Sequence, residues 1–225
     1  MAKYLGKKNT NNMKNSHLTL GLFLCILFTF SYSIPSAAQI TPRVQLVSIS
    51  SSGTTGNRAA SQASISGDGR FVAFISEANN LSPNDSNGSA DVFVHDRLYG
   101  TTELVSISSS GMQANAEVTF ARISLDGRFV IFESPASNLT PNYENGFNAI
   151  FQHDRLTGIT ERLSTSIQGI VNTPSTSSDG RYSAFSNNTE IYIHDSLTRF
   201  SYAINSAEVH DPASKYDALL SSDGR

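Results

Sequence analysis

Short strand-like segments, each bounded by glycine, serine or aspartate, run through residues 44–225. The turn sequence S-x-D-G-R closes such a segment four times, at residues 66–70, 124–128, 177–181 and 221–225. Apolar and polar positions alternate before most of these turns, and the runs FVAFIS, FVIFES and YSAFSN follow the first three. Alternation indicates a half-buried strand, and a continuous apolar run indicates a strand covered on both faces. No long stretch after residue 44 shows helical periodicity.

A second recurring pair, His-Asp, ends a third predicted strand in each copy, at residues 91–96, 149–154 and 190–195. A fourth follows at residues 102–108, 160–166 and, more weakly, 200–206. The aspartate of the DGR turn and the aspartate of the His-Asp pair lie 28 residues apart in the first two copies and 16 apart in the third. The third copy therefore lacks a loop between them. Each unit thus predicts four strands. Asp-Gly in the first hairpin, and Gly100 or Gly158 in the second, supply the left-handed residue that a tight turn requires.

Four short antiparallel strands in a repeated unit of 40–60 residues are typical of a β-propeller. We therefore predict an all-β fold of propeller blades: about three complete blades, an orphan first strand and a partial last blade, which form an incomplete ring. The orphan, Val44–Ser50, matches the fourth strand of the first copy. We expect it to complete a blade whose first strand is Lys215–Ser221. A solenoid or a two-sheet sandwich is the alternative, but a sandwich has no reason to repeat its hairpin sequences.

Residues 1–38 have the pattern of a secretory signal peptide. Four lysines and no acid precede the apolar run Leu18–Phe30, and Ser36 and Ala38 are the small residues before a cleavage site. The run is short against the ~20 residues that span a bilayer, so we expect no membrane span after cleavage, with an uncleaved anchor as the alternative. Met13 is an alternative true start. We expect residues 39–225 to form one repeat domain, truncated at its C-terminus within the fourth turn.

The charge and the cysteine content of the sequence limit the classes of partner and of chemistry that we expect. All 19 acidic residues follow residue 38, whereas four of the 16 basic residues precede it. An acidic surface repels phosphate backbones, so nucleic acid is not an expected partner. Cys25 is the one cysteine and lies in the signal. The remainder has no disulfide, thiol nucleophile or cysteine metal ligand. We predict a periplasmic or extracellular location.

The phrases S-x-DGR-F/Y-x-A-F and D-V-F-V-H-D-R-x-x-G resemble the repeat of TolB-type (WD40-like) propeller proteins, whose common form is S-P-D-G-K-x-I-A-F. NNLSPND and TTELVSIS resemble secreted bacterial proteins that are arrays of this repeat. The resemblance covers residues 44–225 and implies a propeller without implying an activity. It is not a resemblance to TolB itself, which carries an α/β domain ahead of its propeller.

The loop SPNDSNGSAD offers a candidate calcium site. Asp85, Asn87 and Asp91 place oxygen ligands around a glycine turn, as calcium loops do. A distal glutamate is missing, and Tyr143 and Asn148 replace the two aspartates in the second copy. We therefore expect no cofactor and an ordinary Asn-Gly turn, with bound calcium as the alternative.

The other candidate chemistry is sparse. His95, His153 and His194 share one repeat position at the end of the third strand. We expect half-exposed histidines entering a hairpin, with the following aspartate capping the turn, and no metal site. G-x-S-x-G, the nucleophile motif of propeller-linked peptidases, does not occur. Charged residues on the predicted inner strands are few: Arg122, Lys215 and Asp217.

These observations favour a non-enzymatic, exported propeller scaffold that binds a protein or glycan partner at the cell envelope. One alternative is a propeller-type polysaccharide lyase or hydrolase, which needs acids, histidine or arginine converging on the axial channel. Another is a calcium-stabilised surface adhesin. Open blade edges also predict self-association.

Overall fold

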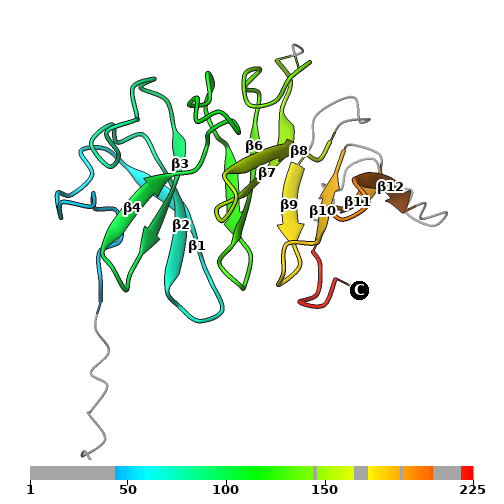
Figure 1. The fold of residues 1–225 in the computed structure, drawn as a ribbon, viewed down its shortest axis with the longest axis horizontal. Helices are drawn as coiled ribbons and strands as arrows, with labels where there is room; N and C mark the ends of the chain where they lie inside the picture. Colours follow the sequence, from blue (N-terminus) through cyan, green and yellow to red (C-terminus); the bar gives the residue numbers. More distant parts are fainter. Residues whose placement is uncertain (1–43, 144–145, 165–171, 188–189, 205–218, 225) are drawn as a thin grey trace, which may run out of the picture. The chain divides into compact units, whose positions relative to one another are not determined.

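The computed structural model describes residues 44–143, 146–164, 172–187, 190–204 and 219–224. The predicted signal peptide lies outside these ranges. Strands are the only regular elements of the described residues, and they form three four-stranded antiparallel sheets (Figure 1). The described residues contain no helix long and apolar enough to cross a membrane.

Each sheet is a meander in chain order, as the repeat predicts, and is called a blade below. The first blade holds β1 (Ala60–Ile65), β2 (Phe71–Ser76), β3 (Asp91–Asp96) and β4 (Thr101–Leu104). The second holds β5 (Phe120–Ile123), β6 (Phe129–Ser134), β7 (Ala149–Asp154) and β8 (Ile159–Arg162). The third holds β9 (Asn172–Thr176), β10 (Tyr182–Ser186), β11 (Ile191–Asp195) and β12 (Phe200–Ile204).

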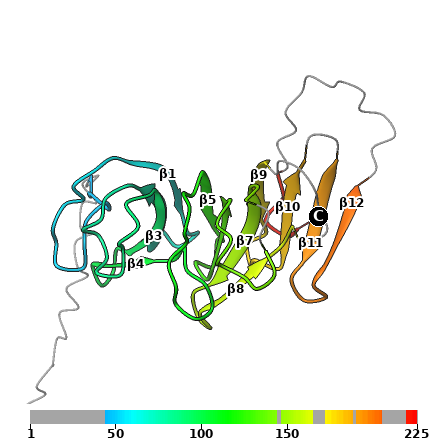
Figure 2. The ribbon, with the colours of Figure 1, turned by 90° about the horizontal axis from the view of Figure 1, so that it is seen from above.

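The blades pack face to face in sequence order (Figure 2). The first strand of one blade lies against the first and second strands of the blade before it, so β5 contacts β1 and β2, and β9 contacts β5 and β6. Successive four-stranded meanders packed through their inner strands are the blades of a β-propeller. The predicted fold class is confirmed: three complete blades are present, followed by the first turn of a fourth.

The core lies between blades because β2, β3, β6 and β7 are covered on both faces. Every residue of β3 is buried, and β2, β6 and β7 each have one partly buried residue at a strand end: Phe71, Phe129 and Asp154. One apolar cluster joins the first two blades and includes Val94, Val130 and Phe132. The continuous apolar runs of the sequence are therefore strands packed between layers, as predicted.

The DGR glycines are required by backbone conformation and by a close approach. Gly127 has φ 74°, and a Cβ on it would lie 2.5 Å from Cδ2 of Phe71 in the preceding blade. Gly180 meets Phe129 in the same way, and a Cβ on Gly224 would lie 2.5 Å from Cδ2 of Tyr182. The repeated turn is thus an inter-blade joint as well as a hairpin: the aromatic residue after one DGR packs on the glycine of the next.

The predicted orphan strand differs from the structure. Residues 44–50 form one isolated bridge, Ile49 to Thr55, and no strand, because the described residues provide no neighbouring strand for them. Thr102 donates to the Ile49 carbonyl. Thr160 of the second blade donates to Ile107 in the same way, so residues 44–50 occupy the position of a preceding blade's fourth-strand end. Most of the predicted partner strand, residues 215–218, lies outside the described residues.

Candidate functional site

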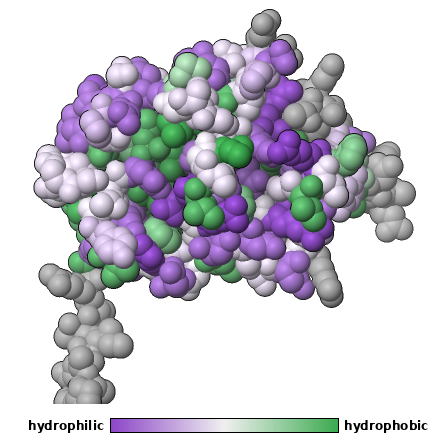
Figure 3. Space-filling view, viewed as in Figure 1, coloured by the Kyte–Doolittle hydropathy of each residue, from purple (hydrophilic) through white to green (hydrophobic). Residues whose placement is uncertain are grey.

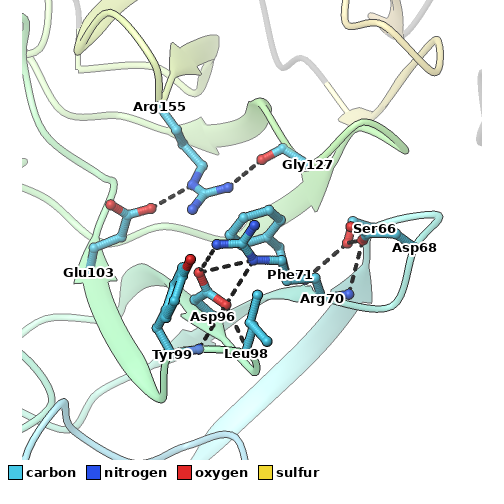
Figure 4. Close-up of polar contacts among 10 residues, drawn as sticks. All are labelled: Ser66, Asp68, Arg70, Phe71, Asp96, Leu98, Tyr99, Glu103, Gly127 and Arg155. Carbon is cyan, nitrogen blue, oxygen red and sulfur yellow. Dashed lines mark hydrogen bonds and ion pairs between the residues drawn. The ribbon is translucent and has the colours of Figure 1, made fainter.

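The arginine of each DGR turn forms an ion pair with the aspartate of the His-Asp pair in the same blade. In the first blade, the Arg70 guanidinium donates to both Asp96 carboxylate oxygens, with Nε–Oδ1 and Nη2–Oδ2 distances of 3.0 and 2.7 Å (Figure 4). Asp96 also accepts from the amides of Leu98 and Tyr99, which confirms that this aspartate caps the turn. The same ion pair recurs in the other blades, as Arg128–Asp154 and Arg181–Asp195.

These aspartates are structural anions. The Arg128 hydrogen bonds lower the pKa of Asp154 to about 2, and Arg181 lowers the pKa of Asp195. A carboxyl group held ionised in this way is a poor general acid. The arginine partner was missed by the sequence analysis, although the joint recurrence of DGR and HD was a signal for it.

The expectation of half-exposed histidines is wrong. His95 is fully buried, and His153 and His194 are each 4% exposed. Each imidazole bonds a hydroxyl of the fourth strand of its own blade, and that hydroxyl donates to a carbonyl of the segment that precedes the blade. Nδ1 of His95 lies 2.9 Å from Oγ1 of Thr102. That hydroxyl donates to a carbonyl of the preceding segment, so Nδ1 carries the proton.

The buried histidines are uncharged, and each is linked through a fourth-strand hydroxyl to the segment that precedes its blade. The Nε2 atoms of His95 and His194 have no hydrogen-bond partner among the described residues. Burial lowers the pKa of all three imidazoles, that of His153 to about 4. The described residues contain no group of three His, Cys, Asp or Glu side chains placed to hold a metal ion.

Asp85 and Asp91, the two carboxylates of the candidate calcium loop, lie close together and share the side-chain amide of Gln113. Nε2 of Gln113 donates to Asp85 Oδ1 and Asp91 Oδ2, each at 2.8 Å. Asp91 also accepts from Ser106, and burial raises the pKa of Asp91 to about 6. Asn87 is engaged in the turn, where its Oδ1 accepts from the Ser89 amide. Gln113, which comes from the next inter-blade connection, was not predicted from the sequence as a partner of these aspartates. The expectation of an ordinary turn without a cofactor, with bound calcium as the alternative, stays a prediction.

The inner strands give little support for catalysis. Among the described residues of β1, β5 and β9, Arg122 is the one charged side chain, and it is exposed. Lys215 and Asp217 lie outside the described residues. The described inner strands therefore bring no pair of acid and base groups together.

A guanidinium site joins the first two blades. Arg155 follows Asp154 in the β7–β8 turn, and its side chain is 14% exposed. Its guanidinium carbon lies 4.1 Å from the centroid of the Phe71 ring. Its Nε donates to the Glu103 carboxylate of the first blade, and its Nη1 donates to the Gly127 carbonyl (Figure 4). A ring face, a carboxylate and a carbonyl thus surround the cation.

The corresponding crevice between the second and third blades is open. Ser196 stands where the earlier copies have arginine, and a cavity of about 370 Å³ lies beside it. The cavity wall includes Phe129, Glu161 and Gly180, the counterparts of the three Arg155 partners. Gln152 bridges the wall: its Nε2 donates to the Gly180 carbonyl and its Oε1 accepts from Ser196.

Arg199 pairs with Glu161, the carboxylate of the open crevice. It has φ 60° and stands where the first two blades have Gly100 and Gly158. Its Nη2 atom lies 2.8 Å from Oε1 of Glu161, and its side chain is 74% exposed. The face of the molecule drawn in Figure 3 is mixed, with separate apolar patches set among hydrophilic residues.

The blade topology and the inter-blade joints define a β-propeller. No family model and no curated protein matches this chain. It is similar to the crystal structure of TolB from Acinetobacter baumannii (19% identity, TM-score 0.47) over 74% of this chain and 36% of that one. It is also similar to a putative TolB from Agrobacterium tumefaciens (17%, 0.48), over 75% and 52% of the two chains.

A third similar structure is the β-propeller domain of the Trilobed protease from Pyrococcus furiosus (14% identity, TM-score 0.45), over 67% of this chain and 44% of that one. The chain thus spans between about a third and about a half of the length of these three structures. The fold assignment for this chain rests on its own blade topology.

Proposed function

We propose that this chain is a non-enzymatic, exported β-propeller scaffold that binds a protein or glycan partner at the cell envelope. The observation that carries the proposal is the open crevice between the second and third blades. An aromatic ring, a carboxylate and hydrogen-bonding groups line a cavity of about 370 Å³ there. Concave sites with an apolar wall and a few converging polar groups are typical of binding sites.

Two further features support binding and export. The described inner strands lack a pair of acid and base groups, and the aspartates of the HD pairs are neutralised by arginine. The signal-like residues 1–38 support export.

Site-specific photo-crosslinking in envelope extracts tests the proposal. A photoreactive phenylalanine analogue replaces Leu197, beside the open crevice, or Leu156, the corresponding residue beside the crevice that Arg155 fills. We expect one protein or glycan species to attach at position 197, to be displaced by excess unlabelled chain, and to be absent at position 156. Repeated failure to capture a competable species at position 197 would contradict the proposal.

Activity assays test the enzymatic alternative. The full chain is incubated with a panel of acidic and neutral polysaccharides, with and without added calcium, and new reducing ends and unsaturated products are measured. We expect no turnover. Turnover that survives purification would replace the scaffold function with a lyase or hydrolase.

A further inference from the structure

We propose that the crevice between the second and third blades binds a guanidinium group supplied by another molecule, the arginine side chain of a partner polypeptide. This inference rests on the proposed binding function and names the chemistry of its site. It starts from the filled crevice between the first two blades, where the chain itself supplies the guanidinium of Arg155.

The three groups that hold Arg155 have counterparts in the open crevice through the repeat. Phe71, Glu103 and the Gly127 carbonyl hold Arg155. Phe129, Glu161 and Gly180 occupy the equivalent positions beside the open cavity. Ser196 stands in place of the arginine, and Gln152 stands where the first blade has Val94. The short Ser196 side chain reaches Gln152 and the Gly180 carbonyl.

One face of the Phe129 ring is available for a cation. Two guanidinium carbons lie near Phe71, from Arg70 at 4.6 Å and Arg155 at 4.1 Å from the ring centroid. Among the described residues, Phe129 has one, Arg128, at 4.7 Å. A second guanidinium over Phe129 would reproduce the arrangement at Phe71, where cation–π attraction acts on the ring from two arginines.

The polar groups of the crevice can accept a further donor. The Gly180 carbonyl has two lone pairs, and Gln152 makes its one short bond, at 2.6 Å. Glu161 is 30% exposed, and its partner Arg199 is largely in solvent. Exposed ion pairs contribute little stability, so Arg199 can swing aside or share the carboxylate with an incoming cation.

The geometry favours guanidinium over ammonium. A planar guanidinium stacks on a ring while its donors, fixed in one plane, reach two acceptors in different directions. A lysine ammonium is a compact, strongly hydrated charge that gains less from the ring. The filled crevice shows that the wall residues accept guanidinium when it is present in the same chain.

Titration of the full chain with matched probes tests the inference. The probes are acetyl-Gly-Arg-Gly-amide, acetyl-Gly-Lys-Gly-amide, agmatine and butylamine, followed by calorimetry and backbone amide NMR. We expect the arginine peptide to bind roughly 10-fold more tightly than the lysine peptide, with shifts at Phe129, Gly180 and Ser196. Tighter binding of the peptide than of agmatine identifies a polypeptide source, and equal binding identifies a small guanidinium compound.

Two variants and one control locate the site. Ser196→Arg fills the crevice from within the chain and should abolish binding. Glu161→Gln should weaken binding by about 5- to 10-fold through loss of the charge-assisted bond. Glu103→Gln alters the filled crevice and should leave binding unchanged. If Ser196→Arg does not fold, Ser196→Leu blocks the same cavity.

Equal binding of arginine and lysine peptides, or unchanged binding by a folded variant at position 196, would overturn the inference. Failure here is distinct from failure of the scaffold function. A partner captured at position 197 that arginine probes do not displace would keep the scaffold and reject the guanidinium site.

Discussion

The Arg155 guanidinium of the second blade lies 4.1 Å from the ring centroid of Phe71 in the first blade. The same side chain bonds Glu103 of the first blade and the Gly127 carbonyl of its own blade. One arginine therefore ties two blades at the point where the aromatic ring packs on the DGR glycine. The third blade lacks this tie because Ser196 replaces the arginine.

Replacing Arg155 with serine should open a second crevice like the one beside Ser196. We expect a loss of about 1–3 kcal/mol in the free energy of unfolding, from the cation–π contact and the hydrogen bonds to a carboxylate and a carbonyl. Urea denaturation of the full chain measures this loss. The control is Arg58→Ser, since Arg58 and Glu77 form an exposed pair at 3.9 Å. Equal effects of the two substitutions would contradict a role for Arg155 between blades.

Gly127→Ala should destabilise the chain far more than Gly158→Ala. Both glycines have positive φ, 74° and 71°, so both substitutions carry the left-handed cost of roughly 1–2 kcal/mol. A Cβ at position 127 also meets the Phe71 ring at 2.5 Å, whereas a Cβ at position 158 meets nothing within 4 Å. The difference between the two unfolding free energies therefore reports the inter-blade contact. Similar values would show that Phe71 moves aside freely.

Acidification should weaken the fold through the buried histidines. The pKa of His153 is about 4 in the folded chain and about 6.5 in an unfolded one. Between these values the unfolded chain binds the extra proton, so stability falls as the pH drops from 6.5 towards 4. The slope is at most about 1.4 kcal/mol per pH unit for one histidine.

Unfolding free energies from pH 7 to pH 4.5 test this expectation, with His153→Gln as the variant. The variant should have a shallower pH dependence than the parent chain. Asp91 must be intact in both, because its raised pKa of about 6 acts in the opposite direction, with stability lost as pH rises from ~4 to ~6. An unchanged slope in the variant would contradict the assignment of a neutral buried His153.

Gln113 should determine whether the loop at residues 85–91 responds to calcium. Its amide donates to both Asp85 and Asp91, so we expect millimolar calcium to leave the melting temperature of the parent chain unchanged. Gln113→Glu replaces that donor with a third carboxylate. It should lower the melting temperature in EDTA and make it rise with added calcium, because oxygen ligands then surround the space. A calcium-dependent rise in the parent chain would instead support the calcium-stabilised alternative.

The sequence alone determined the strands, the hairpins and the blade repeat. These features are local, because a period of two, a buried apolar run and an Asp-Gly turn each act within a few residues. The turn aspartates were predictable for the same reason: Asp68 accepts from the Ser66 hydroxyl and the Arg70 amide of its own turn. Residues 44–50 were predicted as a strand and are not one, because a strand needs a partner that local sequence does not supply.

Only the tertiary structure decided the contacts between distant residues. The Arg70–Asp96 pair, the burial of His95 and the placement of Gln113 between two aspartates each depend on how blades and turns pack. The open crevice depends on packing in the same way. A serine in place of one repeat arginine is visible in the sequence, but the cavity beside it exists because the ring, carboxylate and carbonyl that hold an arginine come from two blades.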